Sequence, residues 1–481
     1  MIQSFVGTIV SLLLFTVLPI AIIVTVAKRF SGRSRGGAAQ PVRGFFQYAV
    51  TYGLLVVVAV GVSGLLGLLL RGGTTLVADP GALAMYLSFT VVGAPLLTVM
   101  VMWARKRIAR DPDETRAPAL GLFVTIATLT ALGNALVNLS TLLGWAIRAS
   151  VYDVDVAQAI AKVVVWGAVW AVLWRVHGRL SSPTAARTHH ILGSAGTGIT
   201  AIVGMIAVLG QLVRLALGYD GVALVSSTQA SVADSLPVLV VGLLGWSIYW
   251  LRTASRDERS VLWHAYVLLG GVGAGFVMVV VAASTLVYRL LVWFIGDPET
   301  ANMRLHFNGA PMSLAVIATG GLWWLHHRSL LGTRQERTEV VRVYDYILSG
   351  ISLVSSAVGL SIVVVAGIET AVPGTIIAGS SSLNTLLAAL TLLAVGGPLW
   401  WSFWHRIQRT AHGEATVELA SPTRRVYLYA LFGVGGISAI VSLLVAVYIL
   451  FNDLIAGNLT ALTVRDMRYA LGVLASTASA Y

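Results

Sequence analysis

Uninterrupted apolar runs constrain the fold of this chain more than any other feature. Gly53 to Leu70 and Val434 to Phe451, for example, are each 18 residues long and contain no charged residue. A helix of about 20 apolar residues crosses the hydrocarbon core of a bilayer. Of the 481 residues 11% are charged, whereas soluble domains have about a quarter. We therefore expect nearly the whole chain to lie in a membrane as α-helices.

A tryptophan followed by basic residues closes alternate apolar runs and indicates an internal repeat. The tryptophans are spaced by 71, 76, 74 and 80 residues; they are Trp103, Trp174, Trp250, Trp324 and Trp404. Such regular spacing is typical of a duplicated unit. Because tryptophan rings favour the lipid–water boundary, we expect all five to be interfacial anchors.

The other helix of each unit begins with a basic residue followed by aromatic residues, as at Arg43, Arg259, Arg342 and Arg425. Each unit is thus one helix leaving the basic side and one returning to it. The six hairpins are expected at 43–107, 117–179, 189–254, 260–328, 340–407 and 424–481.

These hairpins, preceded by one span, predict an all-α, polytopic transmembrane protein of about 13 spans. The expected parts are an N-terminal helix with a basic cytoplasmic linker and three four-helix repeats, the third with a shortened last helix. Their boundaries are 1–42, 43–188, 189–339 and 340–481.

The distribution of charge predicts the orientation. Of the 32 lysines and arginines, 24 lie in the loops after the first span and after each tryptophan, whereas the 20 acidic residues divide evenly between the two sides. The positive-inside rule places the basic side in the cytoplasm, facing anionic headgroups. We expect a multi-pass protein of the prokaryotic plasma membrane with its N-terminus outside. The formal charge of +12 then requires no nucleic-acid partner.

Catalytic signatures are missing from the sequence. The chain has no cysteine, which removes disulfides, thiolate metal sites and cysteine nucleophiles. No catalytic or metal site is predicted, and an enzyme is less expected than a non-enzyme. Charged groups inside a membrane are the usual sign of transport, but Lys162, Arg214 and Arg289 fall near helix ends, where snorkelling explains them.

Asn134 and Asn138 form the most central polar pair, four residues apart on one helix face. Amides at this spacing can bond to a neighbouring helix. The alternative is a polar lining for a substrate or a quinone.

Histidines at the basic ends of helices allow a redox hypothesis. A b-type haem requires two facing imidazoles and no cysteine. The candidates are His177, His264, His326, His327 and His405. Against haem, arginine occupies the corresponding place in sister units, and arginine does not coordinate metal.

Two prolines, Pro95 and Pro398, occupy matching places inside returning helices. A shared kink is the simpler interpretation. The alternative is an opened backbone that lines the site of a small-molecule transporter.

Arg424 to Tyr429, together with Gly397 to Trp401 and Trp404-His405, resembles a bacterial membrane family known as domain of unknown function 5671. The resemblance implies about three four-helix copies and supplies no activity or ligand. Our leading hypothesis is a structural or accessory membrane subunit that packs against partner proteins or lipids. A haem- or quinone-binding electron-transfer protein and a transporter not coupled through a buried carboxylate are the alternatives.

Overall fold

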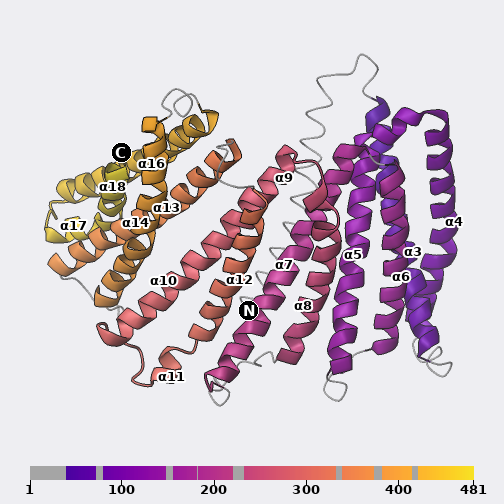
Figure 1. Ribbon diagram of the computed structural model, residues 1–481, viewed down its shortest axis with the longest axis horizontal. Helices are drawn as coiled ribbons and strands as arrows, with labels where there is room; N and C mark the ends of the chain where they lie inside the picture. Colours follow the sequence, from indigo (N-terminus) through magenta and orange to yellow (C-terminus); the bar gives the residue numbers. More distant parts are fainter. Residues whose placement is uncertain are drawn as a thin grey trace. The chain divides into compact units, whose positions relative to one another are not determined.

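The computed structural model describes residues 39–71, 80–147, 155–180, 182–219, 232–331, 339–372, 382–413 and 421–480 (Figure 1). Within these ranges the secondary structure is entirely helical, and ten helices are long and apolar enough to cross a membrane. This confirms the all-α fold predicted from the apolar runs. The expected first span, with its N-terminus outside, lies outside the described residues.

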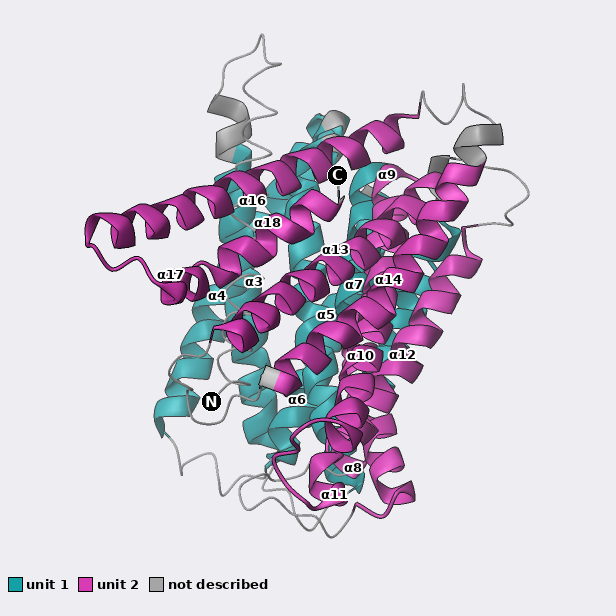
Figure 2. Ribbon diagram, turned by 90° about the vertical axis from the view of Figure 1, so that its left-hand side faces the viewer, with its two compact units in different colours: residues 1–198, 240–257 teal, residues 199–239, 258–481 magenta. Residues whose placement is uncertain are grey.

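The chain divides into two compact units, which Figure 2 distinguishes by colour. Unit 1 contains residues 1–198 and 240–257, and unit 2 contains residues 199–239 and 258–481.

Unit 1 is built from two helical hairpins and the adjoining ends of two further helices. Its elements are α3 (Ala39–Leu70), α4 (Pro80–Arg110), the 3-10 turn η2 (Pro112–Arg116), α5 (Pro118–Ile147), α6 (Val156–Leu180), the first part of α7 (Pro183–Ala216), the end of α8 (Val232–Trp246), the π-helical segment η3 (Ser247–Leu251) and the 3-10 turn η4 (Ala254–Arg256). Helices α3 and α4 pair, α5 and α6 pair, and α3 packs on α6. The buried residues Ala59, Ala131 and Trp166 join α3, α5 and α6.

Unit 2 is also built from helices that follow one another along the chain. It contains the remaining parts of α7 and α8 and then α9 (Val261–Ala265), the π-helical segment η5 (Tyr266–Gly273), α10 (Ala274–Phe294), α11 (Met303–His306), α12 (Ala310–Ser329), α13 (Glu339–Ala371), α14 (Ser382–Gly413), α16 (Pro422–Ile455), α17 (Ala461–Asp466) and α18 (Arg468–Ala480). Its core joins η5, α10, α13 and α14 through residues such as Val272, Phe276, Leu348 and Phe403.

The first helix of a four-helix set packs on the fourth. This holds for α3 with α6 and for α13 with α18. Between α7 and α12, Gly210 lies against Met312 and Ala315. In the first and third sets this contact joins the two hairpins.

Both prolines singled out in the sequence lie inside long helices, Pro95 in α4 and Pro398 in α14. Proline removes one backbone hydrogen bond from a helix. The helices continue through both positions, because neighbouring helices in a membrane bundle can compensate for the loss.

Candidate functional site

Polar pairs join the first helix of each four-helix set to the second helix of its hairpin, at the basic end of that helix or in the loop that follows it. Arg107 donates to Gln47 at 3.2 Å, and His190 Nδ1 lies 2.8 Å from Asp257 Oδ2. Arg406 forms the third pair, 3.6 Å from a carboxylate oxygen of Asp345. Charge-assisted pairs of this kind fix the positions of the helix ends.

A second set of pairs lies at the opposite ends of the helices. Arg71, directly after α3, pairs with Asp155 just before α6, and Arg468 of α18 lies 2.8 Å from Glu369 of α13. Between α7 and α12 the corresponding contact is a hydrogen bond of 2.8 Å from Arg214 to the side-chain oxygen of Asn308. The middle set therefore uses a neutral amide where its sisters use an ion pair.

Two buried histidines from different helices meet at the basic end of unit 1. The rings of His177 on α6 and His189 on α7 have centroids 4.4 Å apart. They are 3% and 1% exposed, respectively. Thr125 of α5 lies 3.4 Å from His177 Nε2. Three helices thus enclose an imidazole pair.

Aromatic rings complete this histidine cluster. Trp174 packs against His189 at 5.6 Å and against Tyr249 at 4.9 Å. Tyr249 in turn lies 5.3 Å from His189, and its hydroxyl accepts a hydrogen bond of 3.0 Å from Trp170. The rings are consequently held from α6, α7 and η3 at once.

The π-helical geometry of η3 accompanies the inward position of Tyr249. The tyrosine side chain is fully buried and lies directly over Gly193 of α7, where any added Cβ would collide with its ring. An extra residue in a helical turn changes the direction of the side chains that follow, and such π segments often occur at functional sites. Gly193 is required here because only a residue without a Cβ admits the ring.

The histidine cluster is tightly packed, and its described residues do not form a set of metal ligands. In the described residues His189 has no hydrogen-bond partner at either ring nitrogen, and no group of three or more His, Cys, Asp or Glu can hold a metal ion. A bis-histidine haem places its macrocycle between two imidazoles. His177 and His189 contact each other directly in this structure, and His177 as a haem ligand stays a prediction.

The remaining haem candidates lie in unit 2, where His264, His327 and His405 each pack on a tryptophan. His327 is fully buried and packs on Trp323 at 4.5 Å and on Gly271 of η5, whereas His326 is its neighbour on α12. His264 packs on Trp263 at 5.1 Å, and His405 stacks on Trp401 at 5.5 Å. Their positions as haem ligands stay untested.

The amides of Asn134 and Asn138 bond within their own helix. Asn134 donates to the carbonyl oxygen of Thr130 at 2.9 Å, and Asn138 donates to that of Asn134 at 2.7 Å. The expected bond to a neighbouring helix is therefore replaced by bonds four residues back along α5.

The five repeat tryptophans differ in environment. Trp103, Trp174, Trp324 and Trp404 are partly exposed, and an arginine guanidinium lies over the first and third of these rings at 5.6 and 5.8 Å. Trp250 in η3 is 0% exposed. Its side chain is consequently buried in protein and does not face lipid as an interfacial anchor would.

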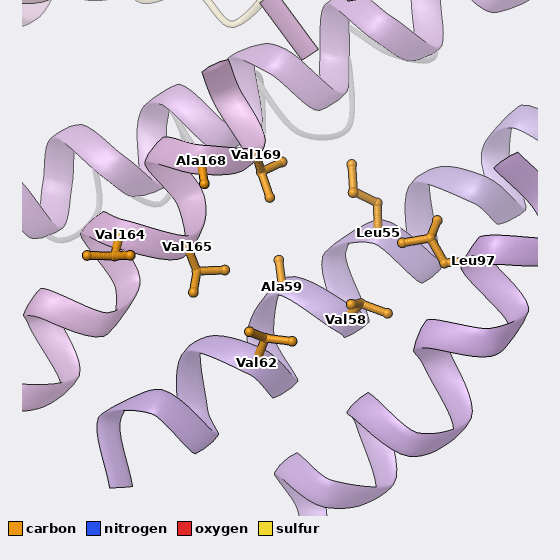
Figure 3. A pocket seen from close by; sticks show the side chains of 9 residues that line it. All are labelled: Leu55, Val58, Ala59, Val62, Leu97, Val164, Val165, Ala168 and Val169. Carbon is orange, nitrogen blue, oxygen red and sulfur yellow. The ribbon is translucent and has the colours of Figure 1, made fainter. Parts of the chain in front are cut away.

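A groove of about 360 Å³ lies between α3, α4 and α6 of unit 1 (Figure 3). Its walls are wholly apolar, and Leu97 lines it two residues after Pro95. Ligand sites combine apolar walls with a few placed polar groups. This groove has none, so it lacks the means to orient a polar substrate.

Together these features define a multi-pass membrane protein assembled from three four-helix repeats. The model of the family described as domain of unknown function 5671 matches residues 44–168, 187–322 and 342–479. The chain belongs to this family. No curated protein and no solved structure matches it.

The three matches give the polar pairs a common place in the repeat. Gln47, His190 and Asp345 each stand three residues after the start of a match. At the opposite ends, Arg71, Arg214 and Glu369 each stand 27 residues after the start. Sequence reasoning missed both sets, as it missed His189, because they emerge only when the copies are compared residue by residue. In that comparison His189 takes the place of Phe46 and Tyr344.

Proposed function

We propose that the protein is a non-enzymatic structural or accessory subunit of a prokaryotic plasma membrane, with its basic loops in the cytoplasm. One observation carries the proposal. Helices α4 and α16 contribute little to the protein's own core, since Gly93 is the buried residue of α4 and Ala446 that of α16.

Much of the surface of α16 is apolar and exposed, although one face packs on α18 and α13. Phe432, Val434, Ile437 and Leu444 are 55%, 69%, 65% and 65% exposed, and successive helical residues are turned by about 100° from one another. In its most apolar stretch 6% of the residues are buried, against 56% for residues 261–294. Such a helix presents its surface outward.

A partner helix is the occupant we propose for part of this surface, with lipid over the rest. Transmembrane helices associate through close packing, for which small residues are required. Gly433, Gly435 and Gly436 lie together in the first half of α16, and among the described residues no atom outside the local helix lies within 4 Å of the position of a Cβ on Gly433. The glycines thus supply a place for close backbone approach.

Photo-crosslinking in native membranes tests the proposal. A crosslinking residue at Leu444 is compared with one at Val137 of α5, a matched control because both side chains are 65% exposed. We expect a discrete protein adduct from the α16 position and only lipid labelling from α5. Lipid labelling at both positions, or an isolated chain that turns over a substrate, would contradict the proposal.

A further inference from the structure

The middle repeat departs from its sisters at the ends opposite the basic loops. In the first repeat Arg71 is neutralised by Asp155, and in the third Glu369 is neutralised by Arg468. In the middle repeat Arg214 occupies the same place but meets Asn308. An amide accepts a hydrogen bond and carries no charge, so among the described residues Arg214 has no carboxylate partner.

The surroundings of Arg214 satisfy only part of its hydrogen-bonding capacity, which favours binding of an anion. Its Nη1 donates to both the side chain and the backbone of Asn308, at 2.8 and 3.2 Å. Its Nη2 is buried and has no hydrogen-bond partner among the described residues. The guanidinium also lies 5.9 Å from the ring of Tyr219. Leaving a buried donor of a charged group without an acceptor costs free energy, because the group has lost its hydrogen bonds to water.

Two further arginines reach the same short segment. Arg289 of α10 donates to the backbone oxygen of His306, and its Nη2 lies 3.2 Å from the position of a Cβ on Gly309. Arg304 is exposed and donates to the oxygen of Gly218 at 3.4 Å, close to Arg214 in sequence. Arg214 and Arg289 thus contact residues 306–309, and Arg304 belongs to the same segment. In the described structure none of the three forms an ion pair with a carboxylate.

We propose that Arg214, Arg289 and Arg304 form a binding site for a phosphate-bearing anion. Arginine guanidinium groups match phosphate oxygens in geometry and keep their charge at all relevant pH values. Three cations that pair with no carboxylate in the described part of the chain repel one another, and a bound anion relieves that repulsion. The site also lies at the helix ends opposite the basic loops, on the side that has few lysines and arginines.

The rim of the arginine site favours a lipid headgroup as the source of the phosphate. Leu215, Leu217, Met303 and Leu305 are exposed by 53%, 51%, 59% and 40%, and they flank the arginines along the chain. Trp293 packs on His306 at 5.3 Å, as aromatic rings do at headgroup depth. Arginines beside exposed apolar side chains at a helix end match the phosphate and the acyl chains of an anionic phospholipid. Free phosphate would bind the same arginines through the same oxygen atoms.

The variant Asn308→Asp tests the site with a nearly isosteric change, because it puts a carboxylate opposite Arg214 as Asp155 stands opposite Arg71 in the first repeat. Full-length protein is purified into nanodiscs of phosphatidylcholine with or without phosphatidylglycerol, and bound lipid is counted by native mass spectrometry. We expect retained phosphatidylglycerol on the natural protein and about tenfold less on Asn308→Asp and on Arg304→Gln. Arg425→Gln, at the other helix ends, should retain the natural amount.

A second arm identifies the source of the phosphate. Inorganic phosphate is added to detergent-purified protein and the melting temperature is measured for the natural protein and for Asn308→Asp. A selective effect of phosphatidylglycerol assigns the site to a headgroup, and a rise with phosphate alone, absent in Asn308→Asp, assigns it to a free anion. The proposal fails if neither ligand distinguishes the natural protein from Asn308→Asp.

Discussion

Replacing Gly271 of η5 by alanine should destabilise unit 2 through a single steric contact. A Cβ at this position would lie 2.5 Å from Cδ2 and 2.6 Å from Cβ of His327, whose side chain is 0% exposed. The histidine ring has no open space into which to move. Overpacking of a close-packed core costs about 1–3 kcal/mol.

Gly270→Ala is the matched control, because Gly270 lies in the same π segment and its added Cβ would be 3.5 Å from the ring of Tyr266, an ordinary contact. Both substitutions gain the same helix propensity, up to about 1 kcal/mol. Their difference therefore isolates the steric cost of about 1–3 kcal/mol. At about 2–4 °C per kcal/mol, Gly271→Ala should melt several degrees below Gly270→Ala.

A thermal unfolding assay in detergent measures both variants, and His327→Ala supplies the second test. With the imidazole removed, Gly271→Ala should cost less than in the natural protein, because the contact with Cδ2 is gone and only that with Cβ of residue 327 remains; contacting residues couple in this way in double-mutant cycles. Equal melting temperatures for Gly271→Ala and Gly270→Ala, or additive effects with His327→Ala, would refute the packing derived from the structure.

Three further predictions address the polar pairs and the topology. Glu114→Ala leaves Tyr48 and Arg107 without the carboxylate that they contact at 3.3 and 3.0 Å, and thermal unfolding should show a loss of about 1–3 kcal/mol. Glu369→Arg and Arg468→Glu should each lower the melting temperature, and the double variant should recover most of the loss; equal melting of single and double variants would argue against the pair. The natural chain has no cysteine, so the variants Glu258→Cys and Glu299→Cys each carry a single thiol at an exposed position. A membrane-impermeant maleimide added to intact cells should modify only the Glu299→Cys variant. Modification of Glu258→Cys alone would contradict the predicted orientation.

The helical fold followed from the sequence because bilayer insertion depends on local properties. Apolar run length and the spacing of the tryptophans determined the spans and hairpins, and both were recognisable without tertiary information. The interior positions of Pro95 and Pro398 followed in the same way. The boundaries predicted for the repeats stay predictions.

The polar contacts could not be predicted from local pattern. Asn134 and Asn138 have the spacing of a helix–helix contact, but each amide found an acceptor four residues earlier in α5. Trp250 shares the sequence context of its sisters, yet the π segment places it inside the protein. These outcomes depend on backbone direction and on neighbouring helices, which spacing alone does not determine.

His189 was missed for a related reason. The opening of the middle repeat lacks the basic and aromatic phrase of its sisters, and its histidine replaces Phe46 and Tyr344 at one place in the repeat. A residue-level comparison of the three copies carries that signal. The same comparison shows Arg214 facing an amide where the sister repeats have ion pairs.

A density map of the protein extracted with its native membrane tests the central proposal most directly. The account predicts a second protein chain packed along α16, near Gly433 to Gly436, with lipid around the remaining helices. Density for lipid alone around α16, or for a substrate or haem inside either unit, would contradict the proposal of a structural or accessory subunit.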